Sequence, residues 1–558
     1  MVRCLRFSFL YALVLCSVVA HAQLLPEQGF VSTAHPLAST AGIEALQQGG
    51  NAIDAAIAVT AALAVVEPYG SGLGGGGFYL IRLNSQPSPT YLFLDARETA
   101  PSAAHKDLYM RDGQVQPRLS LDGALAAAIP GIPAALDALT GYAQRPLREN
   151  LQSAIQLAEQ GFAVDELYLE RAGWRLSALQ QDVESSAIFL QHGQLPELGW
   201  HLAQLDLAGT LKQLAEHGGQ SFYHGRLAEL MVQAVQQAGG IWSMQDLADY
   251  QIQWRTPLQV LLADERQLIS APPPSAGGIT LAQSLLILQQ LPWQQVAPVQ
   301  RIHLIVETLR RAYRDRGLLG DPDFVDNPVD RLLSGEHISA LAASIQTQQA
   351  TPSSELTAAP FIHEGDQTTH FAVIDRQGNA VAATLSLNMM FGAAFTVPGT
   401  GILLNDEMDD FAADLSGSNV YGLIASEANQ IAANKRPLSS MSPSFIEGPN
   451  SFAAFGTPGG SRIPSMNLLA ILAHLEGKSP AEWVAAPRIH HQYVPDELGF
   501  EPGALDVQTQ TALRKLGHAV KELTRNYGNQ QVLYWDKQSG HSAAASDPRG
   551  QGVSLGTH

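Results

Sequence analysis

A polar stretch followed by a sharply defined hairpin pattern divides this chain and limits what it can fold into. Between Gln346 and Gln367, the residues Gln, Thr, Ser, Pro and Ala crowd together without any hydrophobic period, which predicts a mobile surface linker. Before it the patterns are mostly helical, and after it they are short alternating strands with frequent Gly. The chain therefore predicts a mixed α+β protein with a helix-rich first part and a strand-led second part.

The hairpin pattern begins directly after the linker. Residues 368–375 alternate and are rich in β-branched side chains, residues 376–379 have turn composition, and residues 380–388 predict a second strand. If the turn is centred near Gln377, residue 368 lies opposite residue 386. Since side chains alternate along a strand, Thr368, Ser386 and Asn388 are then expected on one face of the hairpin.

The first 22 residues have the pattern of a secretory signal. Arg3 and Arg6 precede an apolar run over residues 7–20, and Ala20-His21-Ala22 has the small-x-small form of a cleavage site. A membrane anchor is the alternative, but the run is short for crossing a bilayer. Both cysteines, Cys4 and Cys16, lie in this segment, so a mature chain starting near residue 23 has no thiol for a disulfide, a zinc site or catalysis.

The charge balance argues against nucleic acid and membrane surfaces as partners. The chain has 33 Lys and Arg against 52 Asp and Glu, a formal net charge of −19, and no basic stripe. An anionic substrate would therefore have to be held by a few local arginines and backbone N–H groups.

Two further segments before the linker bear on the fold. Residues 38–66 predict two helices that meet at a Gly49-Gly50-Asn51 break. The run from Gly70 to Gly77 contains a GxGxxG match, yet a helix precedes it and the strand-like residues 78–81 follow it. That order is the reverse of a dinucleotide-binding turn, so the glycines are interpreted as close backbone packing beside a sheet or a site.

A threonine at the start of a strand suggests one kind of chemistry. Its hydroxyl is a poor nucleophile until a base accepts the proton, and the free amine of an N-terminal threonine, with a reference pKa of roughly 8, is such a base. Cleavage of the Gln367–Thr368 bond would create this group. Threonine pairs are common in strands, so the pattern by itself is weak evidence.

Several longer motifs strengthen the interpretation, and with them the chain resembles the γ-glutamyltransferase family. The motifs are GGNAIDAA within residues 39–55, SGLGGGGF from Ser71, LDARETAP from Leu94, PPPSAGG from Pro272, LGDPDFV from Leu319, TTHFAVID from Thr368, GILLNDEMDDF from Gly401, KRPLSSMSP from Lys435 and GTPGGSRI from Gly456. The resemblance implies a four-layer αββα sandwich of the N-terminal-nucleophile hydrolase type. It also implies that a large subunit, residues 23–367, and a small catalytic subunit, residues 368–558, interlock as a heterodimer made from one precursor.

The resemblance also implies the catalytic residues. Thr368 is expected to attack the bond that precedes it and later the γ-carbonyl of a glutamyl donor. Ser386 stands where the family usually has a threonine that contacts the nucleophile, so the hydroxyl is kept and a methyl group is lost. Gly459 and Gly460 are expected to offer backbone N–H groups to the oxyanion.

For the α-carboxylate of the donor, the resemblance implies a cationic partner and hydroxyl groups. Arg97 matches the arginine of the family, and a guanidinium can bind a carboxylate through two hydrogen bonds. Ser439 and Ser440 match the hydroxyl groups that assist it. Tyr421 resembles the aromatic residue of a loop that covers the pocket in some members, which predicts a gated pocket.

For the α-ammonium of the donor, the matching positions are Asn388, Glu407 and Asp410. Two carboxylates and an amide suit a cation with three donors. A solvated acidic loop or a calcium site is the alternative for Glu407, Asp409 and Asp410, although no EF-hand spacing surrounds them.

The expected reaction is ping-pong transfer of a γ-glutamyl group from glutathione or a related compound to water, an amino acid or a peptide. No cofactor or metal is expected, and export predicts a periplasmic or secreted protein without a membrane anchor after signal removal. Two alternatives stay open. One is a glutaryl acylase of the cephalosporin type, and the other is an unprocessed periplasmic binding protein.

Overall fold

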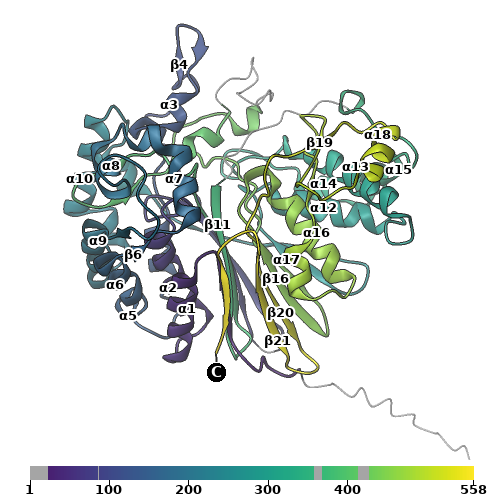
Figure 1. Cartoon of the computed structure of the whole chain (residues 1–558), viewed down its shortest axis with the longest axis horizontal. Coiled ribbons are helices and arrows are strands. Elements are labelled where there is room, and N and C mark those ends of the chain that lie inside the picture. The colour runs from purple at the N-terminus through teal and green to yellow at the C-terminus, as the bar shows by residue number, and fades with distance from the viewer. Residues whose placement is uncertain (1–22, 86, 357–366, 413–425, 558) are drawn as a thin grey trace, which may run out of the picture.

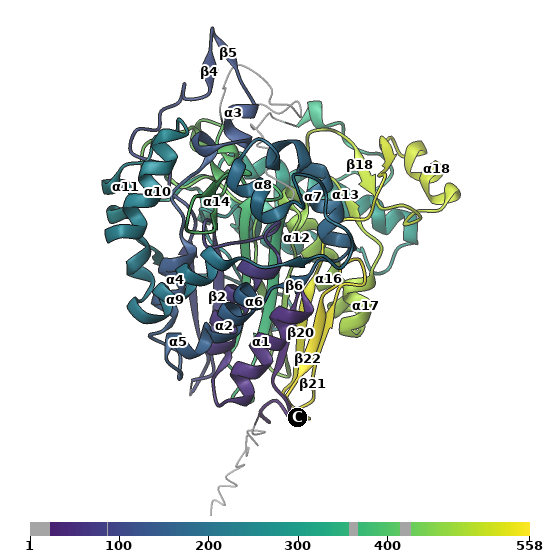
Figure 2. The same ribbon diagram turned by 60° about the vertical axis from the view of Figure 1, so that its left-hand side comes forward.

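Two central β-sheets face each other, and helices cover the outer face of each sheet, in the computed structural model of the chain (Figure 1). The structure describes residues 23–85, 87–356, 367–412 and 426–557. In the turned view the helices that cover the first sheet lie in front of its strands (Figure 2). The expected four-layer αββα sandwich is therefore confirmed.

The first sheet contains strands from both parts of the chain. Its neighbouring strands are all antiparallel, and the order is β22 (Val553–Gly556), β1 (Phe30–Thr33), β11 (Gln367–Ile374), β12 (Ala380–Asn388), β2 (Gly76–Leu83), β3 (Thr90–Ala96) and β8 (Gln253–Arg255). Strands from before and after residue 367 thus hydrogen-bond to each other on both sides of the β11–β12 hairpin.

The second sheet is mixed in the same way. It has the order β21 (Ser542–Ser546), β20 (Gln531–Asp536), β16 (Ser451–Gly456), β15 (Ser444–Glu447), β10 (Gln267–Ser270) and β9 (Leu258–Leu261). The first part of the chain therefore supplies strands to both sheets, and the second part supplies helices as well. The predicted helix-rich and strand-led parts therefore do not correspond to separate layers of the structure.

The outer layers are built from amphipathic and fully apolar helices. The first sheet is covered by α1 (Pro36–Gln47), α2 (Ala52–Val66), α4 (Ile132–Leu139), α6 (Gln152–Gln160), α7 (Glu166–Leu179), α9 (Leu205–His217) and α10 (Gly225–Gln237). The second sheet is covered by α12 (Gly277–Gln289), α13 (Pro298–Arg316), α15 (Gly335–Ala343), α16 (Ile463–Leu475), α17 (Pro480–Ala485) and α18 (Val507–Lys515). No helix among the described residues is both long and apolar enough to span a bilayer.

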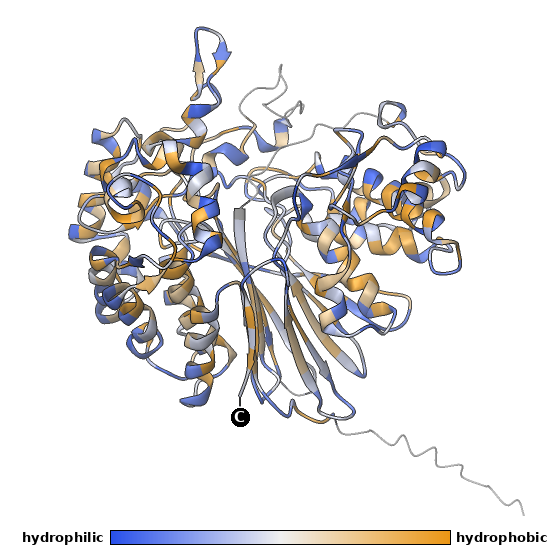
Figure 3. Cartoon of the chain, viewed as in Figure 1, coloured by the Kyte–Doolittle hydropathy of each residue, from blue (hydrophilic) through white to orange (hydrophobic). Residues whose placement is uncertain are grey.

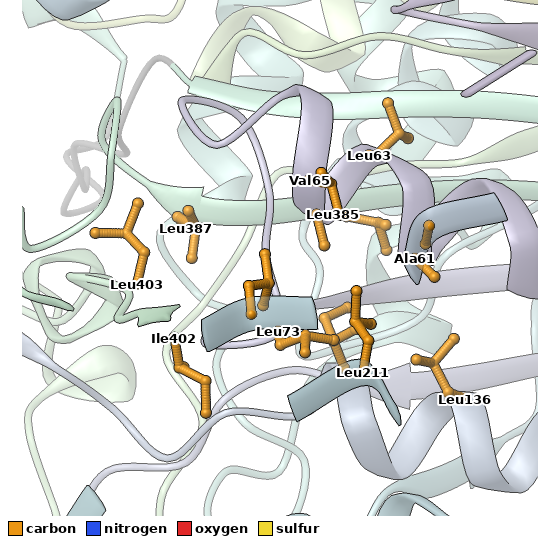
Figure 4. Packing of buried hydrophobic residues seen from close by; sticks show 14 of the residues in the cluster. Ala61, Leu63, Val65, Leu73, Leu136, Leu211, Leu385, Leu387, Ile402 and Leu403 are labelled. Carbon is orange, nitrogen blue, oxygen red and sulfur yellow. The ribbon is translucent and has the colours of Figure 1, made fainter. Parts of the chain in front are cut away.

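Helix α2 shows how the sequence produces this packing. Every residue of α2 is buried, and Val65 lies beside Leu385 of β12 in an apolar cluster that also includes Leu63 and Leu387 (Figure 4). Its start is set by Asn51, whose side chain accepts hydrogen bonds from the first turn while Asp54 closes a capping box. The predicted pair of helices with a Gly-Gly-Asn break is confirmed.

Between the sheets lies a separate aromatic and aliphatic core. It includes Phe78, Phe93, Ile269, Phe445 and Trp535, all fully buried. Figure 3 shows hydrophobic residues along the central strands and the helices beside them. Along β11 the side chains alternate, since residues 371 and 373 pack towards α2 whereas residues 372 and 374 face the second sheet. By this alternation Thr368 faces the second sheet.

The glycine run before β2 is a place of close backbone contact. A Cβ atom on Gly74 would lie 2.1 Å from the carbonyl oxygen of Leu403, and one on Gly75 would lie 2.1 Å from that of Ser386. The interpretation of this run as close packing is confirmed, and a strand, not a helix, follows it. The glycines let the loop lie directly against the strand that carries Ser386.

The predicted linker is described only up to residue 356. In this portion the backbone N–H of Ala350 donates to the carbonyl oxygen of Leu516 at 2.6 Å, and the hydroxyl of Ser353 donates to that of Tyr493 at 2.6 Å. The beginning of the polar stretch is therefore tied to the body of the protein, which differs from the expected mobile linker. Residues 357–366 lie outside the described part of the chain.

Candidate active site

The β11–β12 hairpin brings Thr368 opposite Ser386, in the predicted register. Its turn is held by Asp375, whose carboxylate accepts hydrogen bonds from the backbone N–H groups of Gln377 and Asn379 at 2.9 Å each. An irregularity in the pairing lies between Gln367 and Thr368, at the bond predicted to be cut. Thr368 is 7% exposed, so its hydroxyl lies in a nearly closed environment.

Ser386 and Asn388 lie at the end of β12 on the same side as Thr368. The Ser386 hydroxyl accepts a hydrogen bond of 2.8 Å from the backbone N–H of Asn388. Asn388 adopts a φ of 75°, which asparagine tolerates better than most residues, and its side-chain amide donates to the carbonyl oxygen of Asp406 at 3.0 Å. These contacts fix both side chains beside the nucleophile candidate.

Arg97 lies at the centre of a buried charge cluster, which we call the pocket cluster. Its two terminal nitrogens donate to Glu407 and Asp410, and it also donates to the backbone carbonyls of Pro437 and Leu438 at 3.2 Å each. Arg97 and Glu407 are at most 1% exposed. Burial disfavours the charge of Arg97, but the acidic neighbours raise its pKa overall, so it stays protonated.

The pairing within the pocket cluster was not expected from the sequence. Arg97 was assigned to the carboxylate of a donor, and Glu407 and Asp410 to its ammonium group. In the structure, the groups meant for the two ends of the donor neutralise each other. A zwitterionic donor carries the same two charges, so it can replace these internal ion pairs with pairs of its own.

Ser439 and Ser440 are positioned by the PPPSAGG loop before α12. The backbone N–H of Ser439 donates to the carbonyl oxygen of Pro274 at 2.9 Å, and that of Ala276 donates to the carbonyl oxygen of Ser439 at 2.7 Å. Ser439 borders the cavity beside Thr368. The Ser440 hydroxyl instead accepts from the Nε of Arg316 at 3.2 Å and is not part of the cavity wall.

Gly459 and Gly460 form the turn that leads into helix α16. Their φ values are 135° and 53°, and a Cβ atom on Gly459 would come within 2.7 Å of the Met466 Cε atom. Gly460 borders the cavity, and α16 begins at Ile463 beside it. The turn and the positive end of a helix therefore lie next to Thr368, an arrangement suited to stabilising an oxyanion.

A single small cavity collects most of the predicted site residues. Its wall consists of Arg97, Thr368, Ser386, Asn388, Glu407, Asp410, Ser439, Met441, Gly460 and Ile463. Met441 and Ile463 were not predicted, because apolar side chains inside polar motifs carry no signal of their own. They supply an apolar surface suited to the methylene groups of a substrate. Tyr421 lies outside the described residues.

Glu98 is a further acidic group that the sequence did not single out as part of the site. Its Oε2 lies 3.7 Å from the Arg97 Nη1, and the residue is fully buried. Burial raises the pKa of Glu98 to about 7, although Arg97 opposes the shift. A carboxyl group that is partly neutral near pH 7 reduces the excess negative charge around Arg97.

One group of residues has the donor types of a metal site, although it lies away from this cavity. His303, Glu307 and His518 place their ligand atoms within 4.8 Å of one another. The carboxylate of Glu307 already accepts hydrogen bonds from Arg310 and Arg311, and two guanidinium groups oppose a divalent cation. We interpret this group as a structural network. Together with Arg310, Arg311 and Asp496, we call it the α13 cluster.

The fold and the cavity together define the class of protein. An αββα sandwich with a threonine at the beginning of an inner strand has the architecture of the N-terminal-nucleophile hydrolases. A cephalosporin acylase from Bacillus halodurans, a solved structure, superposes with a TM-score of 0.83 at 25% identity and covers 99% of both chains.

Sequence comparison identifies the family within this class. The gamma-glutamyltranspeptidase family model matches residues 38–557, so the chain belongs to this family. A glutathione hydrolase proenzyme from Pseudomonas sp. (strain A14) is 40% identical over 501 residues, which cover 88% of this chain and 86% of that protein. One from Escherichia coli (strain K12) is 39% identical over 534 residues, which cover 94% and 90%.

Proposed function

We propose that the chain is a self-cleaving γ-glutamyltransferase and glutathione hydrolase with Thr368 as its nucleophile. The observation that carries the proposal is the shared cavity of Thr368, Arg97, Glu407 and Asp410. One hydroxyl nucleophile, one cation and two anions match the γ-carbonyl, the α-carboxylate and the α-ammonium of a glutamyl donor. The relatives named glutathione hydrolase proenzyme support this donor class.

The first step is maturation. The Thr368 hydroxyl attacks the carbonyl carbon of Gln367, and its proton passes to the nitrogen of Thr368 as the peptide bond breaks. Water then hydrolyses the resulting ester, which leaves a carboxylate on Gln367 and a free amine on Thr368. Two subunits result, residues 23–367 and 368–558, and they remain interlocked as a heterodimer.

Turnover follows the same chemistry on a bound donor. The free amine of Thr368 accepts the proton of its hydroxyl, the oxygen attacks the γ-carbonyl, and the backbone N–H groups at Gly459 and Gly460 stabilise the oxyanion. The proton then passes to the leaving amine, and an ester joins the glutamyl group to Thr368. Water or the amine of an amino acid or peptide attacks this ester and restores the enzyme.

The binding roles follow from the charges. Arg97 binds the α-carboxylate with help from Ser439, while Asn388, Glu407 and Asp410 bind the α-ammonium. Ser440, which lies behind the cavity wall, is proposed to assist only by supporting the position of Ser439. Tyr421 is proposed to cover the pocket. Residues 1–22 are proposed to direct export to the periplasm or the medium and to be removed there.

The decisive experiment is the Thr368→Ala substitution. On a denaturing gel the variant should stay one full-length band and release no glutamate, whereas the unaltered protein should give two bands that start near Gln23 and at Thr368. Thr369→Val is the matched control, since this neighbouring side chain faces the opposite side of β11, and it should still be cleaved. Cleavage and glutamate release by Thr368→Ala would refute the proposal.

The glutaryl acylase alternative is separated by substrate choice. Arg97 suits the terminal carboxylate of a glutaryl group as well, but a glutaryl donor has no ammonium for Glu407 and Asp410. The protein should therefore hydrolyse γ-glutamyl-p-nitroanilide much faster than glutaryl-p-nitroanilide. An unprocessed binding protein would show neither hydrolysis nor cleavage.

A further inference from the structure

A buried carboxyl group that the proposed reaction does not use lies against the opposite side of strand β11. Glu67 follows α2 directly and is 4% exposed. Its carboxyl group lies beside the hydroxyl of Thr369, the residue next to Thr368 along the strand. Among the described residues, neither Glu67 Oε2 nor Thr369 Oγ1 has a hydrogen-bond partner of normal geometry. Such orphaned buried polar atoms call for an explanation.

The carboxyl group is held in place by a tight turn. The backbone N–H groups of Gly70 and Ser71 donate to the carbonyl oxygen of Glu67 at 2.8 and 3.1 Å. A Cβ atom on Gly70 would come within 3.2 Å of the Glu67 Cδ atom, so the glycine leaves room for the carboxyl group. The hydroxyl of Ser71 is also buried without a partner among the described residues.

The charged groups that face Glu67 come from the start and first half of α7 and are of opposite sign. Arg171 favours the ionised carboxylate, and Asp165 disfavours it. The phenol of Tyr69 is the further titratable neighbour, and its own pKa lies far above the working range. Burial therefore dominates and raises the pKa of Glu67 to about 7, against the lowering effect of Thr369 and Arg171.

We propose that Glu67 is the counter-charge of the amine that cleavage creates on Thr368, and that it thereby sets the pH at which this amine can act as a base. Glu67 is a positioning residue, because it acts through the amine and does not touch the substrate. The inference rests on the proposed role of Thr368 as an N-terminal nucleophile.

The physical reason is a change of charge at one nitrogen. In the precursor, the nitrogen of residue 368 belongs to a neutral amide. Arg171 and Thr369 then offset only part of the cost of ionising the buried Glu67 carboxyl group. After cleavage the same nitrogen carries an ammonium group one residue from Thr369. The two groups then titrate as a coupled pair, in which the carboxylate stabilises the ammonium and the ammonium stabilises the carboxylate.

The direction of the effect on activity follows. The carboxylate of Glu67 raises the pKa of the Thr368 amine above its reference value of roughly 8, so the free base appears only at higher pH. Removing the negative charge should lower the pKa of the amine. The acid side of the pH profile of kcat/KM should then move to lower pH.

The test is the pH dependence of γ-glutamyl-p-nitroanilide hydrolysis by the Glu67→Gln variant between about pH 5 and pH 10. The acid side of its kcat/KM profile should move down by about one pH unit, the size expected for the loss of one partly screened neighbouring charge. Glu170→Gln is the matched control, since it removes the same charge from the exposed side of α7. It should leave the profile unchanged.

A second variant keeps the test decisive if Glu67→Gln does not mature. Thr369→Val removes the hydroxyl that favours the Glu67 carboxylate, so Glu67 stays protonated to higher pH and the acid side should move in the same direction by a smaller amount. Profiles of the matured variants that superimpose on that of the unaltered protein would overturn the inference. Cleavage and activity in Thr368→Ala would instead overturn the proposed function, so the two failures are distinguishable.

Discussion

The pocket cluster and the α13 cluster are built from the same chemistry but lie in different surroundings. Each groups arginines with carboxylates and joins a residue before position 367 to a residue after it, as in the pairs Arg97 with Glu407 and Arg310 with Asp496. Asp496 is exposed, whereas the other three side chains of these pairs are buried. The pocket cluster borders a cavity with Thr368, whereas Glu307 in the α13 cluster is enclosed by Arg310, Arg311 and the backbone of residue 351. A buried ion pair can form a binding site where a ligand is able to replace one of its partners. Where no ligand can reach it, the pair contributes only to the stability of the fold.

The largest effect should come from Arg97→Ala in the pocket cluster. Losing a guanidinium that makes two charge-assisted hydrogen bonds should lower kcat/KM for γ-glutamyl-p-nitroanilide by roughly a thousandfold. Arg97→Lys keeps the charge but not the two-pronged geometry and should recover part of the loss. Steady-state kinetics on folded, matured protein measures both variants. A loss below about threefold for Arg97→Ala would contradict the assigned role.

Arg311→Met should have the opposite pattern in the α13 cluster. It leaves the buried Glu307 with one guanidinium instead of two, which should cost about 3 kcal/mol of unfolding free energy while KM stays unchanged. Thermal unfolding and donor kinetics on the same preparation separate the two effects. Arg331→Met, on the exposed surface of a short helix, is the control and should change neither quantity. A clear rise of KM in Arg311→Met would contradict a purely structural role for the α13 cluster.

Acid should weaken the α13 cluster in a predictable direction. Burial alone would raise the pKa of Glu307, but Arg310 and Arg311 lower it overall, and Arg310 and His491 hold the pKa of Asp496 well below its usual range despite partial burial. A carboxyl group whose pKa is lowered by folding stabilises the protein above its unfolded pKa, and this stability is lost as the pH falls through the folded value. Thermal stability should thus fall below about pH 4. The fall should be smaller in Glu307→Gln, and equal slopes would contradict the assignment.

Asp410→Asn tests the recognition of the donor ammonium group within the pocket cluster. The ammonium of a γ-glutamyl donor loses one charged partner, so kcat/KM for γ-glutamyl-p-nitroanilide should fall by roughly ten- to a hundredfold. Glutaryl-p-nitroanilide has no ammonium, and its slow hydrolysis should not fall. The ratio of the two rates is the measurement. An equal loss for both substrates would show that Asp410 supports the fold of the pocket and not recognition.

The smallest effect should come from Ser386→Thr. The hydroxyl beside Thr368 is kept, and the added methyl group restricts its rotamer. We expect kcat to change by less than about threefold, because a fixed rotamer is worth only a few tenths of a kcal/mol. Ser386→Ala is the reference, since it removes the hydroxyl and should cost far more. Equal kcat values for the two variants would show that the hydroxyl has no role.

Local features of the site were predictable from the sequence, because they depend on neighbouring residues. The hairpin register that puts Thr368 opposite Ser386 follows from the two-residue period and the turn at Gly378. The Asn51 cap and the glycine packing before β2 follow from backbone chemistry in the same way. The order of the layers came from family resemblance, since periodicity cannot pair strands that are hundreds of residues apart.

Contacts between distant segments were beyond reach of the sequence. Arg97 and Glu407 are 310 positions apart, so nothing local indicates that they neutralise each other in the pocket cluster. Glu67 and Thr369 are likewise far apart in the sequence, and Glu67 carries no motif of its own. Its significance lies in burial and in missing partners, which only the packed structure reveals.

The mixing of strands from both parts of the chain in the first sheet has a consequence for the protein after the proposed cleavage. β1 and β2 belong to the segment before residue 367, and each is hydrogen-bonded along its length to the β11–β12 hairpin that follows the proposed cleavage site. Dilution is therefore not expected to separate the fragments, because releasing either one breaks the pairing of β1 and β2 with the hairpin and exposes the core on both sides of the sheet. The two fragments should unfold together in one cooperative transition, and because unfolding releases two separate chains, the midpoint should rise with protein concentration.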